Sequence, residues 1–518
     1  VWPIKLDKAL QDEILAIADE EKFDGAAGKL LTVRRSTANK LKARRLVVLG
    51  LGEVNKLQAK HWEQHLVKAI NALFALKEVH HLGILLSKDA PNVSAEASVA
   101  LAVDAVHQAT YRSMEAKEPV KDAKKITLLT ESKADARLKA ALERGEVLAR
   151  ARSMVKDLVN HPSNLKNTNT LVNRAKEIGK NADITVKVQS DAKWLEKNMP
   201  CFFTVAKGSL VSDPPKFISL HYKPKSGKAK KHIAIVGKSV IFDTGGYQVK
   251  PGDYMVTMKG DMTGGAVALA VIQALSELKP QGIEVSAYLA ATPNKIDSDA
   301  MIPDSIVDTA CGKKVEIRHT DAEGRLTLID AVTKAAEQKP DEMITIATLT
   351  GAASQAVGYY IALMGNDEAL RGRIHEAGKM HAEPIQTLDV NDDDYENIKS
   401  KLDGADLINT SQRKHRGAQS AAAFVMSGAP DGMPMAHLDI AGADMTPDEK
   451  ATGVSVKTVL QYLLNEAEGA AKSKSSPAKI SKQATKKTAT KKAATSSAKA
   501  KKPKKTTDSK KTKTKARR

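Results

Sequence analysis

The stretch IAIVGKSVIFDTGG, residues 233–246, decides the fold class, because an apolar run leads directly into a glycine turn. The apolar run predicts a buried β-strand. Lys238 lies within the stretch, and Asp243 stands just before the glycines. Charged residues at strand ends and glycine turns are typical of α/β folds, which build functional sites there. The stretch therefore predicts an α/β fold with a site at this edge of a sheet.

Strand-like and helix-like segments alternate over residues 156–468 and predict an α/β domain. The predicted strands are ITVKVQ, PKFISLHYK, KHIAIVGKS, GIEVSAYLAAT and EMITIATLTG, and the predicted helices are AVALAVIQALSEL, LTLIDAVTKAAEQ and GVSVKTVLQYLLNEA. An amphipathic stretch at 136–161, followed by Pro162, predicts a long helix that connects this domain to a smaller one at residues 1–155.

The first 155 residues show a strand–helix–strand rhythm. Strands are predicted at 44–53, 81–86 and 124–131, and helices at 61–76 and 94–112. This order favours a parallel or mixed sheet covered by helices. The GLG at the end of the first strand lacks the full GxGxxG of a dinucleotide site, so a plain turn is the preferred interpretation.

The composition is that of a globular protein, with 518 residues and 42% hydrophobic side chains. No apolar run approaches the roughly 18–20 residues that cross a bilayer, so no transmembrane segment is expected. The cysteines, Cys201 and Cys311, are expected to be reduced, buried thiols of a reducing compartment. The chain begins VWPIK without a methionine, so we expect either a removed presequence or a trimmed chain.

The net charge of +20 is concentrated at the C-terminal end. Residues 470–518 contain 17 Lys, 2 Arg and 1 Asp, a net charge of +18, whereas the rest of the chain has 62 basic and 60 acidic residues. This end has almost no large apolar side chains to offset the entropy cost of ordering. A disordered tail is therefore predicted over 469–518.

A second informative stretch is HTDAEGRL, residues 319–326. In an extended segment, which we expect here, Asp321 and Glu323 would share one face, with Arg325 following them. On its own, D-x-E-G-R is also common in solvated turns with a surface salt bridge. The upstream residues therefore decide between the two interpretations.

Four upstream residues complete an ordered series of charges. MKGDMTGGA places Asp261 before a glycine pair that opens a predicted helix, and Lys250 follows the first glycine turn. With Lys238 and Asp243, the series Lys–Asp–Lys–Asp–Asp–Glu–Arg spans residues 238–325. Several carboxylates can share a small volume only if cations neutralise them.

The residue types favour metal-assisted hydrolysis. Oxygen ligands suit hard or borderline divalent ions, and the sequence has no HExxH motif and no closely spaced cysteine pair for a nitrogen- or sulfur-rich site. Bridging carboxylates are what a two-metal site needs, in which a shared water is acidified and a tetrahedral intermediate is held.

These motifs resemble the leucyl aminopeptidases, the M17 family of dinuclear metallo-exopeptidases. The family signature NTDAEGRL stands here as HTDAEGRL, and the first metal loop stands as VGKSVIFDTGG. The resemblance extends to KGDMTGGA, IATLTGA and MAHLDIAGAD and reaches residue 467. It implies a small N-terminal α/β domain, a catalytic α/β domain with a mixed central sheet, and a homo-hexamer that hydrolyses peptides.

The resemblance implies ligands for two divalent ions, Zn or Mn, with Mg as an alternative. Lys238, Asp243, Asp261 and Glu323 would hold the tighter ion, and Asp243, Asp321 and Glu323 the exchangeable one. Only a neutral amine can ligate, so a dication should lower the pKa of Lys238 strongly.

The resemblance also implies the remaining roles. Lys250 would polarise the scissile carbonyl and stabilise the oxyanion, and Arg325 would anchor a bicarbonate ion that acts as general base. Met258, Thr348 and Gly351 would line an apolar pocket for the first side chain, which favours Leu- or Met-like residues.

Departures from the family pattern surround the site. His319 replaces the usual Asn and is expected to make the same hydrogen bond as a neutral imidazole, while Ser239 and Thr244 are small replacements. The stretches 290–305 and 206–209 differ in loops that bear on substrate preference and oligomer contacts. None removes a ligand or a catalytic cation, so an active enzyme is expected rather than a pseudoenzyme.

The lysine-rich tail resembles those of linker histones and would bind nucleic acid without sequence preference. A solubilising role, an anchor to anionic lipid and an import or nuclear signal remain alternatives. A cytoplasmic location is expected, with nuclear, nucleoid-associated or organellar locations as alternatives. A second function class also stays open: a nucleic-acid-binding or structural scaffold on a peptidase fold with weak or lost activity.

Overall fold

The computed structural model describes residues 6–36, 42–53, 56, 59–76, 79–86, 94–112, 125–130, 133–225, 229–381 and 383–472. The chain divides into one unit at Val1–Ser475 and another at Ser476–Arg518. The predicted tail lies outside the described residues, apart from its first four, which continue the last helix.

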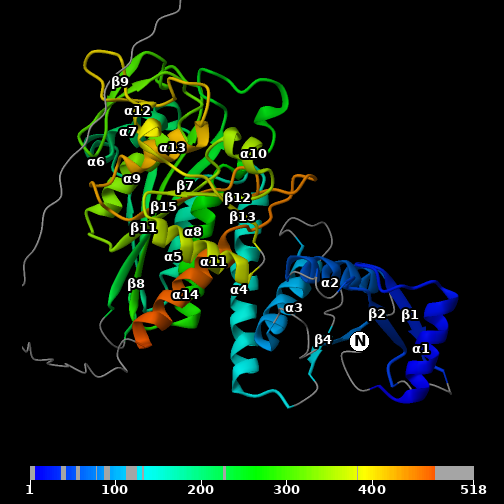
Figure 1. Ribbon diagram of the computed structural model, residues 1–518. Helices are drawn as coiled ribbons and strands as arrows, with labels where there is room; N and C mark the ends of the chain where they lie inside the picture. Colours follow the sequence, from blue (N-terminus) through cyan, green and yellow to red (C-terminus); the bar gives the residue numbers. More distant parts are fainter. Residues whose placement is uncertain are drawn as a thin grey trace, which may run out of the picture. The chain divides into compact units, whose positions relative to one another are not determined.

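The N-terminal part begins with a helix and a strand that were not predicted and then follows the predicted strand–helix order (Figure 1). Its elements are α1 (Lys8–Glu20), β1 (Leu30–Arg34), β2 (Arg45–Leu49), α2 (Ala59–Phe74), β3 (His81–Leu85), α3 (Ala95–Thr110) and β4 (Lys125–Leu129). Strands β1 and β2 pair antiparallel, and β3 and β4 pair in parallel on either side of α3 in the chain. The GLG is a turn, because Gly52 N donates to Gly25 O and Gly50 N to Lys29 O.

The predicted connector is the helix α4 (Ala136–Asn160). The side chain of Asp135 caps its first turn by accepting from Leu138 N at 3.0 Å. The helix ends two residues before Pro162, which cannot continue it. Its inner face packs against both α3 and the larger, C-terminal domain, so α4 belongs to both cores.

The larger, C-terminal domain is built on an eight-stranded mixed sheet in the order β13-β12-β15-β11-β7-β8-β6-β5. The predicted strands are β5 (Ile184–Gln189), β6 (Lys216–Tyr222), β7 (Lys231–Asp243), β8 (Ile283–Asn294) and β11 (Glu342–Ala347). The central strands β8, β7, β11 and β15 (Met435–Asp439) are parallel, whereas β12 (Ile361–Gly365) runs antiparallel to β15 and β6 runs antiparallel to β8. The expected mixed sheet is therefore confirmed.

Helices cover both faces of this sheet. On β7, Ile233 and Ile235 face one core and Ala234 and Val236 face the other, as the two-residue period of a strand requires. The first core is closed by α4, α5 (Thr168–Ile178), α8 (Thr263–Leu278) and α14 (Val456–Lys472). The second is closed by α6 (Ala192–Asn198), α7 (Pro200–Ala206), α9 (Gly324–Ala336) and α13 (Gly417–Met426).

The remaining elements lie at the edges of the domain. They are β9 (Ser305–Asp308), β10 (Lys314–Ile317), α10 (Gly351–Val357), α11 (Glu368–Met380), β13 (Ile385–Thr387), α12 (Asp392–Glu396) and β14 (Leu407–Ile408). Strands β14, β10 and β9 form a separate three-stranded sheet. The chain leaves β10 just before the HTDAEGRL stretch, so this sheet positions one side of the site.

One helical stretch among the described residues, Gly252–Leu278, is long and apolar enough by composition to cross a membrane. No transmembrane segment was predicted, and the apolar part of this stretch was predicted as a helix. Its most apolar window is 72% buried within the fold, since α8 is the central helix of the first core.

Candidate functional site

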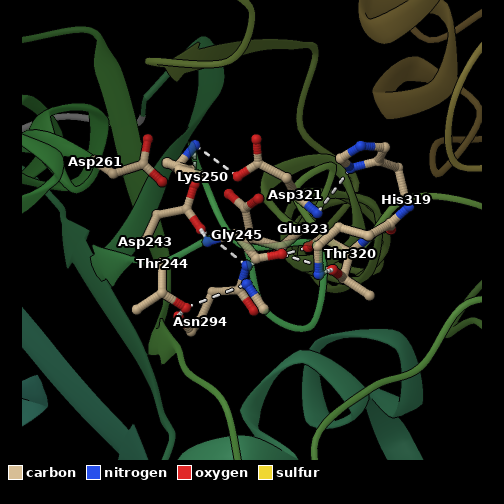
Figure 2. A network of polar contacts seen from close by, with 12 residues as sticks. Asp243, Thr244, Gly245, Lys250, Asp261, Asn294, His319, Thr320, Asp321 and Glu323 are labelled. Carbon is tan, nitrogen blue, oxygen red and sulfur yellow. Dashed lines mark hydrogen bonds and ion pairs between the residues drawn. The ribbon is translucent and has the colours of Figure 1, made fainter. Parts of the chain in front are cut away.

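Strand β7 carries the first two residues of the site. Lys238 lies within the buried strand and Asp243 ends it, after a bulge between Val240 and Asp243. The chain then turns sharply at Gly245, whose φ of +89° is accessible mainly to glycine. Gly245 N donates to Asp243 Oδ1 at 2.9 Å, so the turn orients the carboxylate (Figure 2).

The second segment brings Asp261 to Lys238. Asp261 follows a short 3₁₀ turn, Met258–Gly260, and precedes α8. Its Oδ1 accepts from Lys238 Nζ at 2.7 Å and from Thr348 Oγ1 at 2.9 Å. Thr348, predicted to line the substrate pocket, thus also holds a carboxylate of the site.

The HTDAEGRL segment is a turn and not the extended strand that was predicted. Ala322 N donates to His319 O, and Glu323 already has helical dihedral angles as the residue before α9. Asp321 and Glu323 still face the same site (Figure 2). Glu323 Oε1 lies 2.9 Å from Lys238 Nζ.

Gly324 is needed for a packing reason. A Cβ at Gly324 would lie 2.6 Å from Lys238 Nζ and 2.9 Å from Lys238 Cδ. The lysine therefore reaches Glu323 only because position 324 has no side chain.

Lys250 lies between two carboxylates. Its Nζ is 2.8 Å from Asp243 Oδ2 and 2.6 Å from Asp321 Oδ1 (Figure 2). Burial would lower the pKa of Lys250, but the charge and hydrogen bond of Asp243 and the hydrogen bond of Asp321 raise it. The group is thus a fixed cation at neutral pH.

The protein's own charges do not make Lys238 a neutral amine. Burial would lower its pKa, but the negative charges of Asp261, Glu323 and Asp243 outweigh burial and raise the pKa. This direction is opposite to the one expected for a metal ligand, because only the charge of a bound cation would favour the neutral form.

Carboxylates outnumber the cations that contact them. Burial, with the charges of Asp243 and Glu323, raises the pKa of Asp321 to about 7. Burial likewise raises the pKa of Asp261, although Lys238 opposes the shift. A site that disfavours its own ionised carboxylates gains stability from an added cation.

The donor set fits a divalent metal ion. Oxygen atoms of Asp243, Asp261 and Glu323, all buried, lie within 4.8 Å of one another. Asp261 Oδ2 and Glu323 Oε2 are buried without a hydrogen-bond partner in the described part of the chain. Buried carboxylate oxygens normally have partners, so these two are positioned for a ligand. Asp321 is not in this group of three and contacts Lys250 instead.

Arg325 stands on the first turn of α9 beside these carboxylates. Its Nε is buried and has no hydrogen-bond partner among the described residues. Burial lowers the pKa of Arg325 to about 10, against the effects of Glu323 and Asp439, and the group stays charged at neutral pH.

Two buried asparagines that the sequence analysis did not single out hold the metal loops. Asn294 Nδ2 donates to Asp243 Oδ1 at 2.8 Å and to Thr320 O at 3.1 Å. Asn409 accepts from Arg318 N at 2.8 Å and donates to His319 O at 2.7 Å. Asn294 stands in the 290–305 stretch already noted, whereas no local pattern marks Asn409.

His319 makes a local contact, as expected of a neutral imidazole. Its Nδ1 lies 3.2 Å from Asp321 N and accepts from it (Figure 2). Burial lowers the pKa of His319, with a further contribution from the charge of Lys250. The ring therefore supports the main chain of the turn.

Met258 and Gly351, the other predicted pocket residues, lie on separate elements. Met258 is in the 3₁₀ turn before Asp261, and Gly351 is the first residue of α10. A Cβ at Gly351 would have nothing within 4 Å, so the space beside it is open.

Comparisons with known proteins agree over most of the chain. Residues 153–460 match the cytosol aminopeptidase family, catalytic domain, and residues 3–119 match its N-terminal domain. A probable cytosol aminopeptidase of Persephonella marina is 34% identical over 476 residues, which cover 89% of this chain and 93% of the relative. That of Aquifex aeolicus is 33% identical over 470 residues, which cover 89% of this chain and 92% of the relative.

Solved structures show the same architecture. The bottromycin maturation enzyme BotP superposes with a TM-score of 0.77 at 26% identity, covering 88% of this chain and 96% of that one. Its complex with Mn superposes with a TM-score of 0.77 at 26% identity, covering 87% of this chain and 96% of that one.

Proposed function

Because the chain belongs to the cytosol aminopeptidase family, whose members are divalent-metal-dependent hydrolases of peptides, we propose that it removes N-terminal residues with two bound metal ions. The observation that carries the proposal is the buried group Asp243, Asp261 and Glu323, which has two oxygens without partners. These three buried carboxylates share two lysines, so their two unpartnered oxygens would be stabilised by a further cation.

The proposed ligands follow from the geometry and the family pattern. Lys238, Asp243, Asp261 and Glu323 would hold one ion, and Asp243, Asp321 and Glu323 the other, with Asp243 and Glu323 shared. Zn or Mn suits this mixed nitrogen and oxygen set, with Mg as the weaker alternative. When bound, two such ions would supply an acidified water and a Lewis acid, and bicarbonate would supply the base.

The two cations of the chain would act on the substrate and on the base. Lys250 is held beside Asp243 and Asp321 and would donate a hydrogen bond to the oxygen of the scissile carbonyl as negative charge develops there. Arg325, with its unpartnered Nε, would bind a planar oxyanion such as bicarbonate through its planar guanidinium.

The proposed pocket for the first side chain lies between Met258, Thr348 and Gly351. The thioether of Met258 and the open space beside Gly351 favour an apolar, Leu- or Met-like side chain.

The direct test is hydrolysis of Leu-p-nitroanilide by the full chain loaded with Mn or Zn. Asp321→Ala should lower kcat/KM more than about 100-fold, because it removes a proposed ligand and a partner of Lys250. Asp308→Ala, which removes an exposed carboxylate 2.6 Å from Lys314, should leave kcat/KM unchanged. A folded wild type without hydrolysis at any metal loading would refute the proposal and favour the scaffold alternative.

A second proposed function concerns nucleic acid. The +18 charge of residues 470–518 favours salt-sensitive binding to a phosphate backbone. Deleting 473–518 leaves α14 intact. The deletion should abolish salt-sensitive DNA retention and preserve peptide hydrolysis, and DNA retention that survives it would contradict this function.

Assembly and location complete the proposal. We propose a homo-hexamer, in which six tails would act together and raise the avidity for a polyanion. Exposed Tyr254, Val256 and Tyr359 are large apolar side chains that contacts between subunits would cover.

A cytoplasmic location is proposed from the relatives named cytosol aminopeptidase, and the comparisons do not support the nuclear or organellar alternatives.

A further inference from the structure

One charged side chain near the proposed pocket has no role in the chemistry above. Asp444 is half-buried in the turn that follows β15. The main chain of this turn is held on both sides, because Asp444 N donates to Ile440 O and Thr452 N donates to Asp444 O. The carboxylate, in contrast, forms no ion pair within the described ranges.

The turn Ile440–Asp444 lies between the elements that supply the pocket residues. At its start, Asp439 accepts from Leu349 N at 3.1 Å and from Thr350 Oγ1 at 2.8 Å, which ties it to the segment of Thr348 and Gly351. In its middle, a Cβ at Gly442 would lie 3.1 Å from Ser354 Cα in α10.

At its end, the turn reaches the segment of Met258. A Cβ at Gly260 would lie 3.4 Å from Asp444 Oδ2 and would collide with the methyl group of Met445. Gly260 thus lets the carboxylate and the thioether approach the main chain between Met258 and Asp261. Asp444 therefore stands beside the pocket and adjacent to the metal-binding segment.

The carboxylate is poorly compensated at this position. Burial raises the pKa of Asp444 to about 7, and the main-chain N–H groups of Asp444 and Met445 oppose the shift only partly. Lys238, the side-chain cation that also opposes it, is already within 2.9 Å of both Asp261 and Glu323. A ligand cation beside Asp444 would be stabilised because no side-chain cation among the described residues pairs with this carboxylate.

The walls of the pocket suit the stem of a long cationic side chain. Met258 carries a flexible thioether, and the space beside Gly351 is open. Lysine and arginine combine an aliphatic stem with a charged end and can lie along such walls while the end finds a partner.

We propose that Asp444 is a specificity-determining residue that lets this pocket take N-terminal Lys and Arg in addition to Leu-like residues. The carboxylate would bind the ammonium or guanidinium group of the first side chain, while the stem contacts Met258. The inference rests on the proposed aminopeptidase function and names a substrate class for the same site: peptides that begin with a cationic residue.

The test compares coumarin amides of lysine and norleucine, whose side chains differ only by the terminal ammonium group, on the Mn-loaded full chain. In Asp444→Asn, which keeps the size and removes the charge, the lysine-to-norleucine ratio of kcat/KM should fall at least about 10-fold. Asp448→Asn removes an exposed carboxylate of the same loop, paired with Lys450, and should leave the ratio unchanged.

An unchanged ratio in folded Asp444→Asn overturns the inference. If that variant does not fold, inhibition of wild-type Leu-amide hydrolysis by free lysine and free norleucine decides. Lysine should inhibit at least as strongly as norleucine, and lysine that is more than 10-fold weaker overturns the inference. Wild type that hydrolyses no amino acid amide refutes the aminopeptidase proposal itself, so the two failures are distinguishable.

Discussion

At the scale of single residues, Gly324 determines whether Lys238 can reach the site. The aliphatic chain of the lysine fills the space that a side chain at 324 would occupy, so the residue after the ligand Glu323 must be the smallest one. The DAEGR motif therefore contains the proposed metal ligands and also the glycine that leaves room for the Lys238 side chain.

Gly324→Ala should lower both activity and stability. The added methyl group must displace Lys238 or shift α9, which costs about 1–3 kcal/mol as overpacking and should reduce kcat/KM at least about 10-fold. Thermal melting and Leu-p-nitroanilide hydrolysis measure the two effects. Gly372→Ala is the matched control, because a Cβ there meets nothing within 4 Å and alanine favours the helix α11. Equal melting temperatures and equal kcat/KM values for the two variants would contradict the proposed overpacking at Gly324.

Asn409 acts at the same scale through the main chain of the turn. Its side chain accepts from Arg318 N and His319 N and donates to His319 O and Ala322 O. It therefore satisfies both ends of the turn that presents Asp321.

Asn409→Asp should weaken metal binding about 10–100-fold, because it removes the donor and sets a carboxylate against two main-chain carbonyls. Calorimetric titration with Mn measures the affinity. Asn366→Asp makes the same change in a residue with equivalent bonds, to Met433 O and Met435 N, away from the site. If both variants bind Mn like the wild type, Asn409 has no positioning role.

At the scale of elements, a buried cluster of charges joins the helices of the two domains. Asp104 on α3 contacts Arg152 on α4, and Lys457 on α14 lies 3.4 Å from Asp104 and 3.0 Å from Glu63 on α2. Buried ion pairs are costly to break, because removal of one partner leaves the other as a buried charge with neither a counter-charge nor solvent. The N-terminal helices are thereby bound to the catalytic core by charge as well as by apolar packing.

Asp104→Asn should destabilise the protein by about 3–5 kcal/mol near pH 7.5. Burial would raise the pKa of Asp104, but Arg152 and Lys457 hold it below the usual value. Its stabilising effect is therefore present above the unfolded pKa of about 4 and is lost as the pH falls below that value.

Denaturant unfolding of wild type and Asp104→Asn over a pH series checks the sign of this pH dependence. The difference in the free energy of unfolding between the two proteins should narrow only below about pH 4. Burial raises the pKa of Glu63 in the same cluster, but Glu63 is present in both proteins. Asp308→Asn, at an exposed ion pair, should show no gap at any pH, and a gap that widens in acid would contradict the assignment.

At the scale of the whole molecule, metal binding should be coupled to folding. The site draws residues from β7, from the start of α8 and from the turn before α9, so an ion would link both cores of the catalytic domain. Because the ligand set exists only in the folded chain, binding energy adds to stability.

Mn at about 100 times its Kd should stabilise the chelator-treated protein by about 2.7 kcal/mol, and EDTA should reverse the effect. Thermal melting with and without Mn measures this shift. In Asp261→Asn the shift should be smaller, because a proposed ligand is replaced by a weaker one. A melting temperature that does not respond to Mn in the wild type would argue against metal bound within the core.

Most of the site was predictable because its residues are local to short motifs. Asp243, Asp261, Asp321 and Glu323 stand close to glycines that the sequence displays, and Lys238 lies in the strand that leads to the first of these turns. The structure brings the five side chains to one place. The strands and helices with strong periodicity were also predicted near their observed bounds. Strands β12 and β13 were not predicted, because runs of five and three residues carry little periodic signal, and helices α11 and α13 were also not predicted.

The sequence alone determined the α/β class, the connector helix, the order of the motifs and the family, because these follow from periodicity and from residues adjacent in the chain. Only the tertiary structure decided that HTDAEGRL is a turn, that Asn409 supports it from 90 residues away, and that Asp444 lies against Gly260. Such contacts arise when distant segments pack together, and no spacing within one segment encodes them.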